Sequence, residues 1–152
     1  MEPQKKRGRY SRIRQQLNEL LSKTASPDAR MATIVAVLHH KMDYFSWTGF
    51  YFLNNGELTV KTYQGPLACQ VLEKHQGVCW AGINQGKTII VPDVRLFPGH
   101  IACDSRSRSE IVVPVLDKKG NISGVLDVDS ISLNSFDEID AANLERIVAL
   151  IC

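Results

Sequence analysis

Long apolar runs are missing from this sequence: none approaches the roughly 20 consecutive residues that a helix needs to cross a bilayer. The charged first residues likewise contain no apolar core like that of a secretion signal. We therefore expect a cytoplasmic protein with no membrane partner. In that reducing compartment, the four cysteines favour thiol redox catalysis or metal binding over a framework of structural disulfides.

A net positive charge is lacking outside the first 14 residues. The formal net charge is +2, but residues 1–14 carry +5, which leaves −3 for the rest of the chain. A nucleic-acid role would have to rest on this basic arm alone, so we expect no nucleic-acid partner. We interpret the arm as a solvated or frayed terminus that leads into a helix. The total of 152 residues suits a single domain, which we place at residues 10–152.

Apolar residues recur at helical spacing near both ends of the chain. The first predicted helix ends near Lys23, and a second begins after Ser26, whose side chain suits an N-cap. A closing helix is predicted over about residues 136–151, with Asn134 or Ser135 as its cap. Two helices therefore precede the central part of the chain and one follows it.

Two β-hairpins are predicted between these helices, because alternating apolar residues flank turn-forming residues. The predicted strands cover residues 47–53, 57–63, 69–73, 88–91, 110–116 and 122–129, and a short helix covers residues 78–84. Helices at both ends of an antiparallel sheet define an α+β fold.

One cysteine lies in a segment built from turn-forming residues. Cys103 belongs to the run Pro98-Gly99-His100-Ile101-Ala102-Cys103-Asp104-Ser105, inside an irregular stretch that covers residues 92–108. Proline, glycine, aspartate and serine in this order describe a loop that presents a side chain to its surroundings. Because irregular loops of this length in compact domains are usually functional, the sequence indicates thiol chemistry at Cys103.

Seven segments of the chain resemble those of the free methionine-(R)-sulfoxide reductases, which are enzymes built on a single GAF domain. These segments are Trp47-Thr48-Gly49-Phe50-Tyr51, Gln64-Gly65-Pro66-Leu67-Ala68-Cys69, Gly77-Val78-Cys79-Trp80, Val91-Pro92-Asp93-Val94, residues 97–105, Ser109-Glu110-Ile111-Val112-Val113-Pro114 and Gly124-Val125-Leu126-Asp127-Val128-Asp129-Ser130. The resemblance extends from about residue 10 to the C-terminus. It implies a GAF-like antiparallel sheet flanked by N-terminal and C-terminal helices. It also implies a homodimer, to which the amphipathic first helix points as well.

The resemblance implies a thiol mechanism without a cofactor or a metal. Cys103 would attack the sulfoxide, release methionine and become a sulfenic acid. Cys69 would then condense with it to form a disulfide, which thioredoxin or a similar dithiol would reduce. Cys79 matches the third family cysteine and would relay the disulfide or act as a reserve resolving thiol. Cys152 has no counterpart, and we interpret it as incidental, while His100 is left out of the catalytic set.

Three carboxylates are predicted to converge beside these thiols. Asp127 and Asp129 lie two residues apart and so project from one face of a strand, and Glu110 begins the neighbouring strand. Such a cluster would hold the ammonium group of a free amino acid and raise at least one carboxyl pKa, so that a proton is available for the sulfoxide oxygen. We assign Asp127 to the ammonium group, and Glu110 with Asp129 to the sulfoxide.

Two aromatic residues complete the predicted site. Trp47 and Tyr51 lie four residues apart on one strand and so face the same way, and the resemblance places them around the methyl group of the substrate. Because a methionine inside a polypeptide has no ammonium group, this cluster predicts a preference for the free amino acid.

Three other interpretations stay open. A GAF module that binds a small ligand without turnover is the first, since this fold often serves as a sensor. A zinc site of Cys69, Cys79, Cys103 and His100 is the second, although these residues lack the compact spacing of zinc ligands. A peroxide-reducing enzyme with the same thiols is the third, and it leaves the carboxylates without a role.

Overall fold

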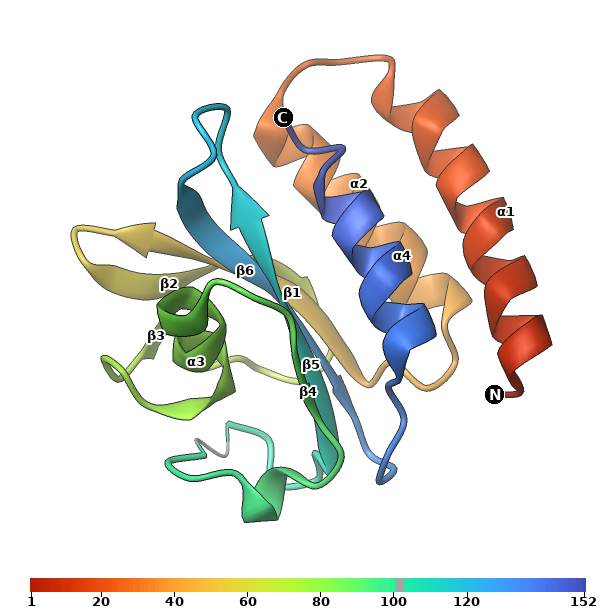
Figure 1. Ribbon diagram of the computed structural model, residues 1–152. Helices are drawn as coiled ribbons and strands as arrows, with labels where there is room; N and C mark the ends of the chain where they lie inside the picture. Colours follow the sequence, from red (N-terminus) through yellow and green to blue (C-terminus); the bar gives the residue numbers. More distant parts are fainter. Residues whose placement is uncertain (101–102) are drawn as a thin grey trace.

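A six-stranded antiparallel sheet separates two layers of other elements in the computed structural model, which describes residues 1–100 and 103–152 (Figure 1). The strand order is β3-β2-β1-β6-β5-β4. The elements are α1 (Pro3–Leu21), α2 (Pro27–Lys41), β1 (Trp47–Asn54), β2 (Glu57–Gln64), β3 (Val71–Leu72), α3 (Gly77–Gln85), β4 (Ile89–Val91), the 3-10 turn η1 (Val94–Leu96), β5 (Ser109–Leu116), β6 (Ile122–Ser130) and α4 (Glu138–Val148). The predicted α+β fold with a GAF-like sheet is confirmed.

Helices α1, α2 and α4 lie together on one face of the sheet and enclose the larger of two apolar cores (Figure 1). The apolar stripe of α1 is buried there, with Tyr10, Ile13 and Leu17 almost fully shielded from solvent. Burial of each such side chain stabilises the fold by roughly 1.5–3 kcal/mol. Because this stripe is covered by elements of the same chain, it gives no support to the predicted homodimer.

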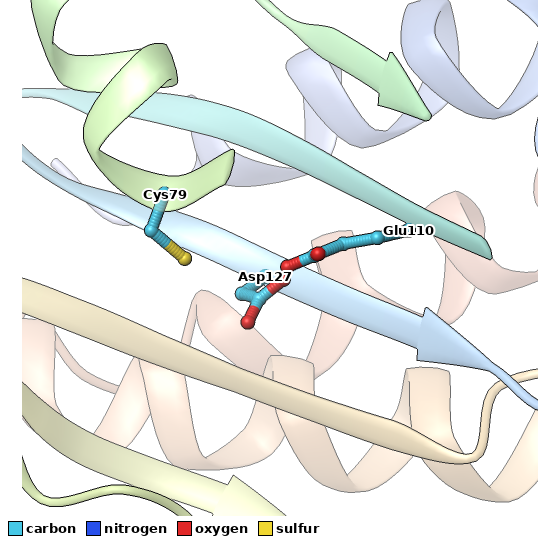
Figure 2. A group of neighbouring side chains, drawn as sticks. All are labelled: Cys79, Glu110 and Asp127. Carbon is cyan, nitrogen blue, oxygen red and sulfur yellow. The ribbon is translucent and has the colours of Figure 1, made fainter. Parts of the chain in front are cut away.

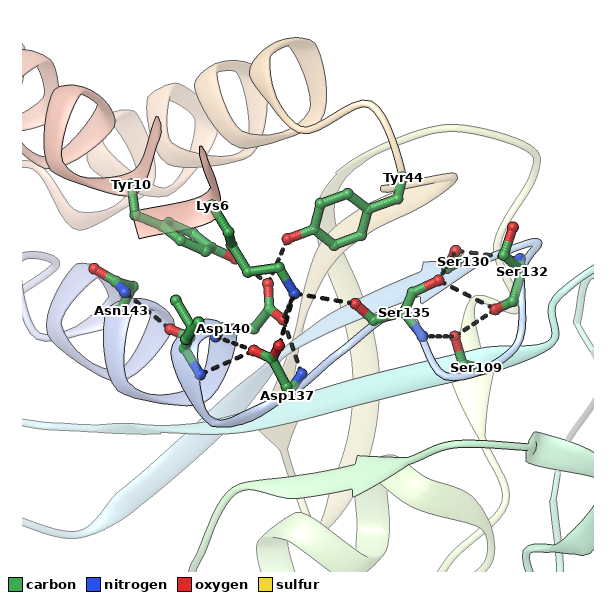
Figure 3. A network of polar contacts seen from close by, with 11 residues as sticks. Lys6, Tyr10, Tyr44, Ser109, Ser130, Ser132, Ser135, Asp137, Asp140 and Asn143 are labelled. Atoms are coloured by element: carbon green, nitrogen blue, oxygen red, sulfur yellow. Dashed lines mark hydrogen bonds and ion pairs between the residues drawn. The ribbon is translucent and has the colours of Figure 1, made fainter. Parts of the chain in front are cut away.

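The basic N-terminal arm is not frayed, which corrects the sequence interpretation. Helix α1 begins at Pro3, and Lys6 is only 2% exposed. Its Nζ lies 2.7 Å from Oδ2 of the fully buried Asp140, whose Oδ1 accepts hydrogen bonds from the hydroxyls of Tyr10 and Tyr44 (Figure 3). Each of these three contacts with Asp140 joins residues 96 or more positions apart in the sequence, so no local pattern could reveal the network.

Breaking this buried ion pair is expected to destabilise the protein strongly. In Lys6→Met the Asp140 carboxylate loses its cation, and removing one partner of a buried pair costs about 3–5 kcal/mol of unfolding free energy. Urea unfolding followed by circular dichroism measures this loss. Lys5→Met, at the exposed neighbouring position, is the matched control and should change the midpoint little. Equal midpoints for the two variants would contradict this account of the arm.

The start of α4 also differs from the prediction. Its N-cap is Asp137, which accepts hydrogen bonds from the backbone N–H groups of Ile139 and Asp140, and neither Asn134 nor Ser135 takes this role. The Asp140 carboxylate accepts a bond from the Asp137 N–H in return, which completes a capping box. The cap therefore lies two or three residues later than predicted, because Asp140 serves both the helix end and Lys6.

The opposite face of the sheet carries α3 and the connecting loops (Figure 1). The long predicted loop is closed at its base, where Val94 N–H donates to the carbonyl of Arg108 at 2.8 Å. It contains the short turn η1 and is otherwise irregular, as expected, while residues 101–102 of its family motif lie outside the described residues. None of the helices in the described residues is both long and apolar enough to cross a membrane.

Candidate active site

Strand register brings the three predicted carboxylates together on the α3 side of the sheet. Glu110 of β5 pairs directly with Asp129 of β6, and Asp127 follows two positions away on the same face. Glu110 and Asp127 are each only 6% exposed, whereas Asp129 is half-buried. Figure 2 shows the side chains of Glu110 and Asp127 converging with Cys79, which α3 supplies from above the sheet.

Burial is the main reason why the carboxyl groups of this cluster have raised pKa values. It raises the pKa of Glu110 well above its usual value, and the negative charges of Asp127 and Asp129 raise it further. Burial also raises the pKa of Asp127 and of Asp129. Like charges in a poorly solvated site cannot all ionise together. The cluster therefore holds a proton at a pH where an isolated carboxyl would have lost it.

Cys79 is held as a neutral thiol. Its pKa is raised well above the usual value by burial first, and then by the negative charges of Asp127, Glu110 and Asp129. A thiolate is the nucleophilic form of cysteine, so this environment suppresses the reactivity of Cys79.

A cavity opens above the carboxylates and is lined by most of the predicted site residues, namely Trp47, Tyr51, Cys79, Cys103, Glu110, Asp127 and Asp129. Two buried polar atoms on its lining, Asp127 Oδ1 and Ser107 Oγ, have no hydrogen-bond partner among the described residues. Buried polar atoms in folded proteins are nearly always paired. These two are therefore available to a polar ligand.

The aromatic pair forms one wall of the cavity, as predicted. The rings of Trp47 and Tyr51 are stacked with centroids 5.8 Å apart. Their polar ends hold the loop that carries Cys69: Trp47 Nε1 donates to the Pro66 carbonyl at 3.1 Å, and the Tyr51 hydroxyl donates to the Cys69 carbonyl at 2.9 Å. Gly49 makes room for the indole, since a Cβ there would lie 2.5 Å from the Trp47 ring.

The two cysteines with assigned redox roles are bonded to each other. A disulfide joins Cys69 and Cys103, whose Cα atoms lie 5.6 Å apart across a sequence separation of 34 residues. Cys69 is half-buried and Cys103 is exposed at the cavity, so an external thiol can reach the bridge. Cys79 and Cys152 are free thiols, the first buried and the second exposed.

His100 lines the same cavity but does not carry the charge that would activate a thiol. It is half-buried, and burial lowers its pKa, which favours the neutral imidazole. The disulfide between Cys69 and Cys103 occupies two of the four ligands of the alternative zinc site, so that site would require the reduced protein.

The sequence interpretation missed two features of the cavity. Ser107 was not singled out, since a serine in an irregular loop has no distinguishing pattern. The N-terminus of α3 borders the cavity through Gln76, Gly77 and Val78, and the Gln76 side chain does not cap it. The dipeptide Gln76-Gly77 was the available sequence signal for this helix start, and the structure shows that Gly77 adopts φ +83°, which glycine tolerates.

Fold and site together define a GAF domain whose cavity combines a cysteine pair with buried carboxyls. The family model of the GAF domain matches residues 24–151. The chain is 48% identical to GAF domain-containing protein A of Dictyostelium discoideum over 96% of this chain and 92% of that one.

Two further relatives have names that specify an enzyme activity. The free methionine-R-sulfoxide reductase of Escherichia coli is 35% identical over 92% of this chain and 84% of its own length. The free methionine-R-sulfoxide reductase of Neisseria meningitidis, solved in complex with its substrate, has a TM-score of 0.88 and 38% identity, covering 93% of this chain and 85% of that one. The chain belongs to the free methionine-R-sulfoxide reductase family.

Proposed function

We propose that this chain reduces free L-methionine-(R)-sulfoxide to methionine, with Cys103 as the nucleophile and Cys69 as the resolving thiol. The observation that carries the proposal is the Cys69–Cys103 disulfide at a cavity whose floor is a buried carboxyl cluster. Family membership supports the substrate. The R configuration is taken from the names of the relatives, which are free methionine-R-sulfoxide reductases.

The reaction divides into three balanced steps. The Cys103 thiol attacks the sulfoxide sulfur, the oxygen passes to the cysteine, and methionine leaves a sulfenic acid behind. The Cys69 thiol then attacks that sulfenic acid, which forms the disulfide and releases water. An external dithiol finally reduces the disulfide through a mixed disulfide and is itself oxidised. Two electrons thus pass from the dithiol to the sulfoxide.

The carboxyl cluster supplies the proton for the first step. We assign this role to Glu110 with Asp129, because Glu110 is buried between two other acids that raise its pKa. Protonation of the sulfoxide oxygen makes the sulfur a better target for the thiolate. Trp47 and Tyr51 form an apolar wall beside this position and would contact the methyl group of the substrate.

The two charged ends of a free amino acid have separate partners in the cavity. We assign the ammonium group to Asp127, whose buried Oδ1 has no partner among the described residues. We assign the carboxylate to the uncapped N-terminus of α3, where free backbone N–H groups and the helix dipole favour an anion. A methionine within a peptide offers neither charge, so both assignments favour the free amino acid.

Removing the charge of Asp127 is expected to weaken this preference. Asp127→Asn should raise KM for free methionine sulfoxide by about 10- to 100-fold, since a hydrogen bond to a charged group contributes roughly 1.5–3 kcal/mol. The KM for the N-acetylated sulfoxide, which has no ammonium group, should change far less. Steady-state kinetics on both substrates measure this, with Asp43→Asn at an exposed position as control. An equal increase in KM for both substrates would contradict the assignment of Asp127 to the ammonium group.

The proposal extends to thioredoxin or a similar dithiol protein as reductant, to a cytoplasmic setting and to a homodimer. The exposure of Cys103 supports attack by an external dithiol. Cys79 is proposed as a reserve or relay thiol, a role that requires first relieving the burial that keeps it protonated.

An assay with both sulfoxide epimers, free and peptide-bound, tests the proposed function. Methionine formation and dithiol consumption are expected in equal amounts from the free R epimer alone. Binding of the sulfoxide without consumption of dithiol would favour the sensor interpretation and contradict the proposed reductase activity.

A further inference from the structure

Cys79 takes no part in the three steps above, yet its thiol lies in the carboxyl cluster. Its Sγ and one carboxylate oxygen each from Glu110 and Asp127 lie within 4.8 Å of one another (Figure 2). The three residues are 4%, 6% and 6% exposed. No other group of this kind, with three or more potential metal ligands, occurs in residues 1–100 and 103–152.

A second observation indicates that this cluster suits a cation. Asp127 Oδ1 is buried and has no hydrogen-bond partner among the described residues. Within this part of the chain, no lysine or arginine forms an ion pair with Glu110, Asp127 or Asp129. Burying carboxylates without a counter-charge is costly, and an ion that brings positive charge into the cavity would offset that cost.

One cysteine sulfur and two carboxylate oxygens favour some cations over others. Zinc and similar thiophilic cations bind a cysteine sulfur at about 2.3 Å and carboxylate oxygens at about 2.0–2.2 Å. Tetrahedral coordination with these bond lengths places the ligand atoms about 3.4–3.6 Å from one another. The ligand atoms here already lie within 4.8 Å of one another, so side-chain rotations that shorten their separations by up to roughly 1.4 Å would complete the coordination. Magnesium and calcium prefer six or more oxygen ligands and gain little from a sulfur.

We propose that Cys79, Glu110 and Asp127 bind a thiophilic divalent cation, with zinc as its probe, and that the bound ion excludes the substrate. Binding displaces the Cys79 proton and the proton held by the carboxyl cluster, and it involves no electron transfer. The ion would be an inhibitor, because it would occupy the acid and the ammonium-binding carboxylate that the proposed reaction needs. The exclusion part rests on the proposed function, because the ion would occupy the place assigned to the substrate ammonium group.

This site differs from the zinc site considered from the sequence, since it uses neither Cys69 nor Cys103. It is therefore available while those two cysteines are bridged. That difference allows a clean experiment with disulfide-bonded protein carrying Cys152→Ser, in which Cys79 is the one remaining free thiol.

Calorimetric titration of this protein with zinc is expected to show one bound ion, with magnesium binding at least about 100-fold more weakly. Cobalt should give the charge-transfer absorption of a cobalt–thiolate bond, which identifies the sulfur ligand without any further variant. Adding Cys79→Ser should abolish that absorption and weaken zinc binding about 100-fold, and Asp127→Asn should weaken it about 10-fold. Circular dichroism checks that each variant is folded.

Absence of zinc binding, or cobalt binding without the thiolate absorption, would overturn the site. Zinc that binds only after the disulfide is reduced would place the ion on Cys69 and Cys103, which also overturns it. None of these readouts requires turnover, so they stand apart from the proposed function. Exclusion of the substrate by the ion is tested by single-turnover reduction with reduced protein and no added thiol reagent. Zinc should raise the sulfoxide concentration that gives the half-maximal rate, and an unchanged concentration would contradict the exclusion.

Discussion

Replacing Cys103 with serine is expected to abolish sulfoxide reduction, lowering kcat/KM by about 1,000-fold or more, since a hydroxyl is a far weaker nucleophile than a thiolate. The structure places this residue at the cavity and in a disulfide with Cys69, while Cys79 is held as a neutral thiol. Cys69 is not among the described residues that line the cavity, and Cys152 is exposed outside it, so no other cysteine should replace Cys103. Methionine formed per enzyme, measured by chromatography with excess dithiol, gives the result.

Two matched variants sharpen this prediction. Cys152→Ser alters an exposed thiol outside the cavity and should leave the rate unchanged. Without added dithiol, Cys69→Ser should release one equivalent of methionine and keep a sulfenic acid at Cys103, which a sulfenic-acid reagent would label. Slow loss of that label would show that Cys79, whose burial keeps it protonated, acts as the reserve thiol. Substantial turnover by Cys103→Ser would show that a different thiol attacks the sulfoxide.

Replacing Glu110 with glutamine is expected to lower kcat for sulfoxide reduction by about 100- to 10,000-fold, the range that a positioned general acid contributes. The amide keeps the size of the side chain but has no acidic proton to give to the sulfoxide oxygen. Reaction of Cys103 with hydrogen peroxide should change little, because that reaction does not need this acid. Parallel rate measurements with the two oxidants test the difference.

The pH profile gives an independent signature of the same acid. In the wild type, kcat should fall as the pH rises through the raised pKa of the carboxyl cluster, because the acid then loses its proton. Glu110→Gln should remove most of this decline, and Glu57→Gln, an exposed control, should retain it. Equal losses with sulfoxide and peroxide would contradict the assigned role and favour the peroxidase interpretation.

Local patterns predicted the sheet and the carboxyl cluster well. The two-residue period of a strand placed Asp127 and Asp129 on one face, and the hairpin placed Glu110 on the adjacent strand. The direct pairing of Glu110 with Asp129 depends on a register shift at Val115 and Leu116, which the sequence did not predict. The same two-residue period placed the aromatic pair on one wall of the cavity. These predictions succeeded because each depends on neighbours that are close in the sequence.

The errors arose where residues far apart in the sequence meet. Lys6 looked like one charge in a solvated arm, and only its contact with Asp140 reveals a buried ion pair. The same contact explains why α4 begins at Asp137 and not at an earlier cap. The closeness of Cys79 to the carboxyls depends on the packing of α3 onto the sheet, which no sequence spacing encodes.

Disulfide mapping after a single turnover tests the central claim most directly. Fully reduced protein is mixed with one equivalent of free methionine-(R)-sulfoxide, quenched with a thiol-blocking reagent, digested and analysed by mass spectrometry. We predict a bridged peptide that joins Cys69 to Cys103, in an amount equal to the methionine released, with Cys79 and Cys152 still blocked as free thiols. Methionine released while Cys69 and Cys103 both remain free would contradict the account.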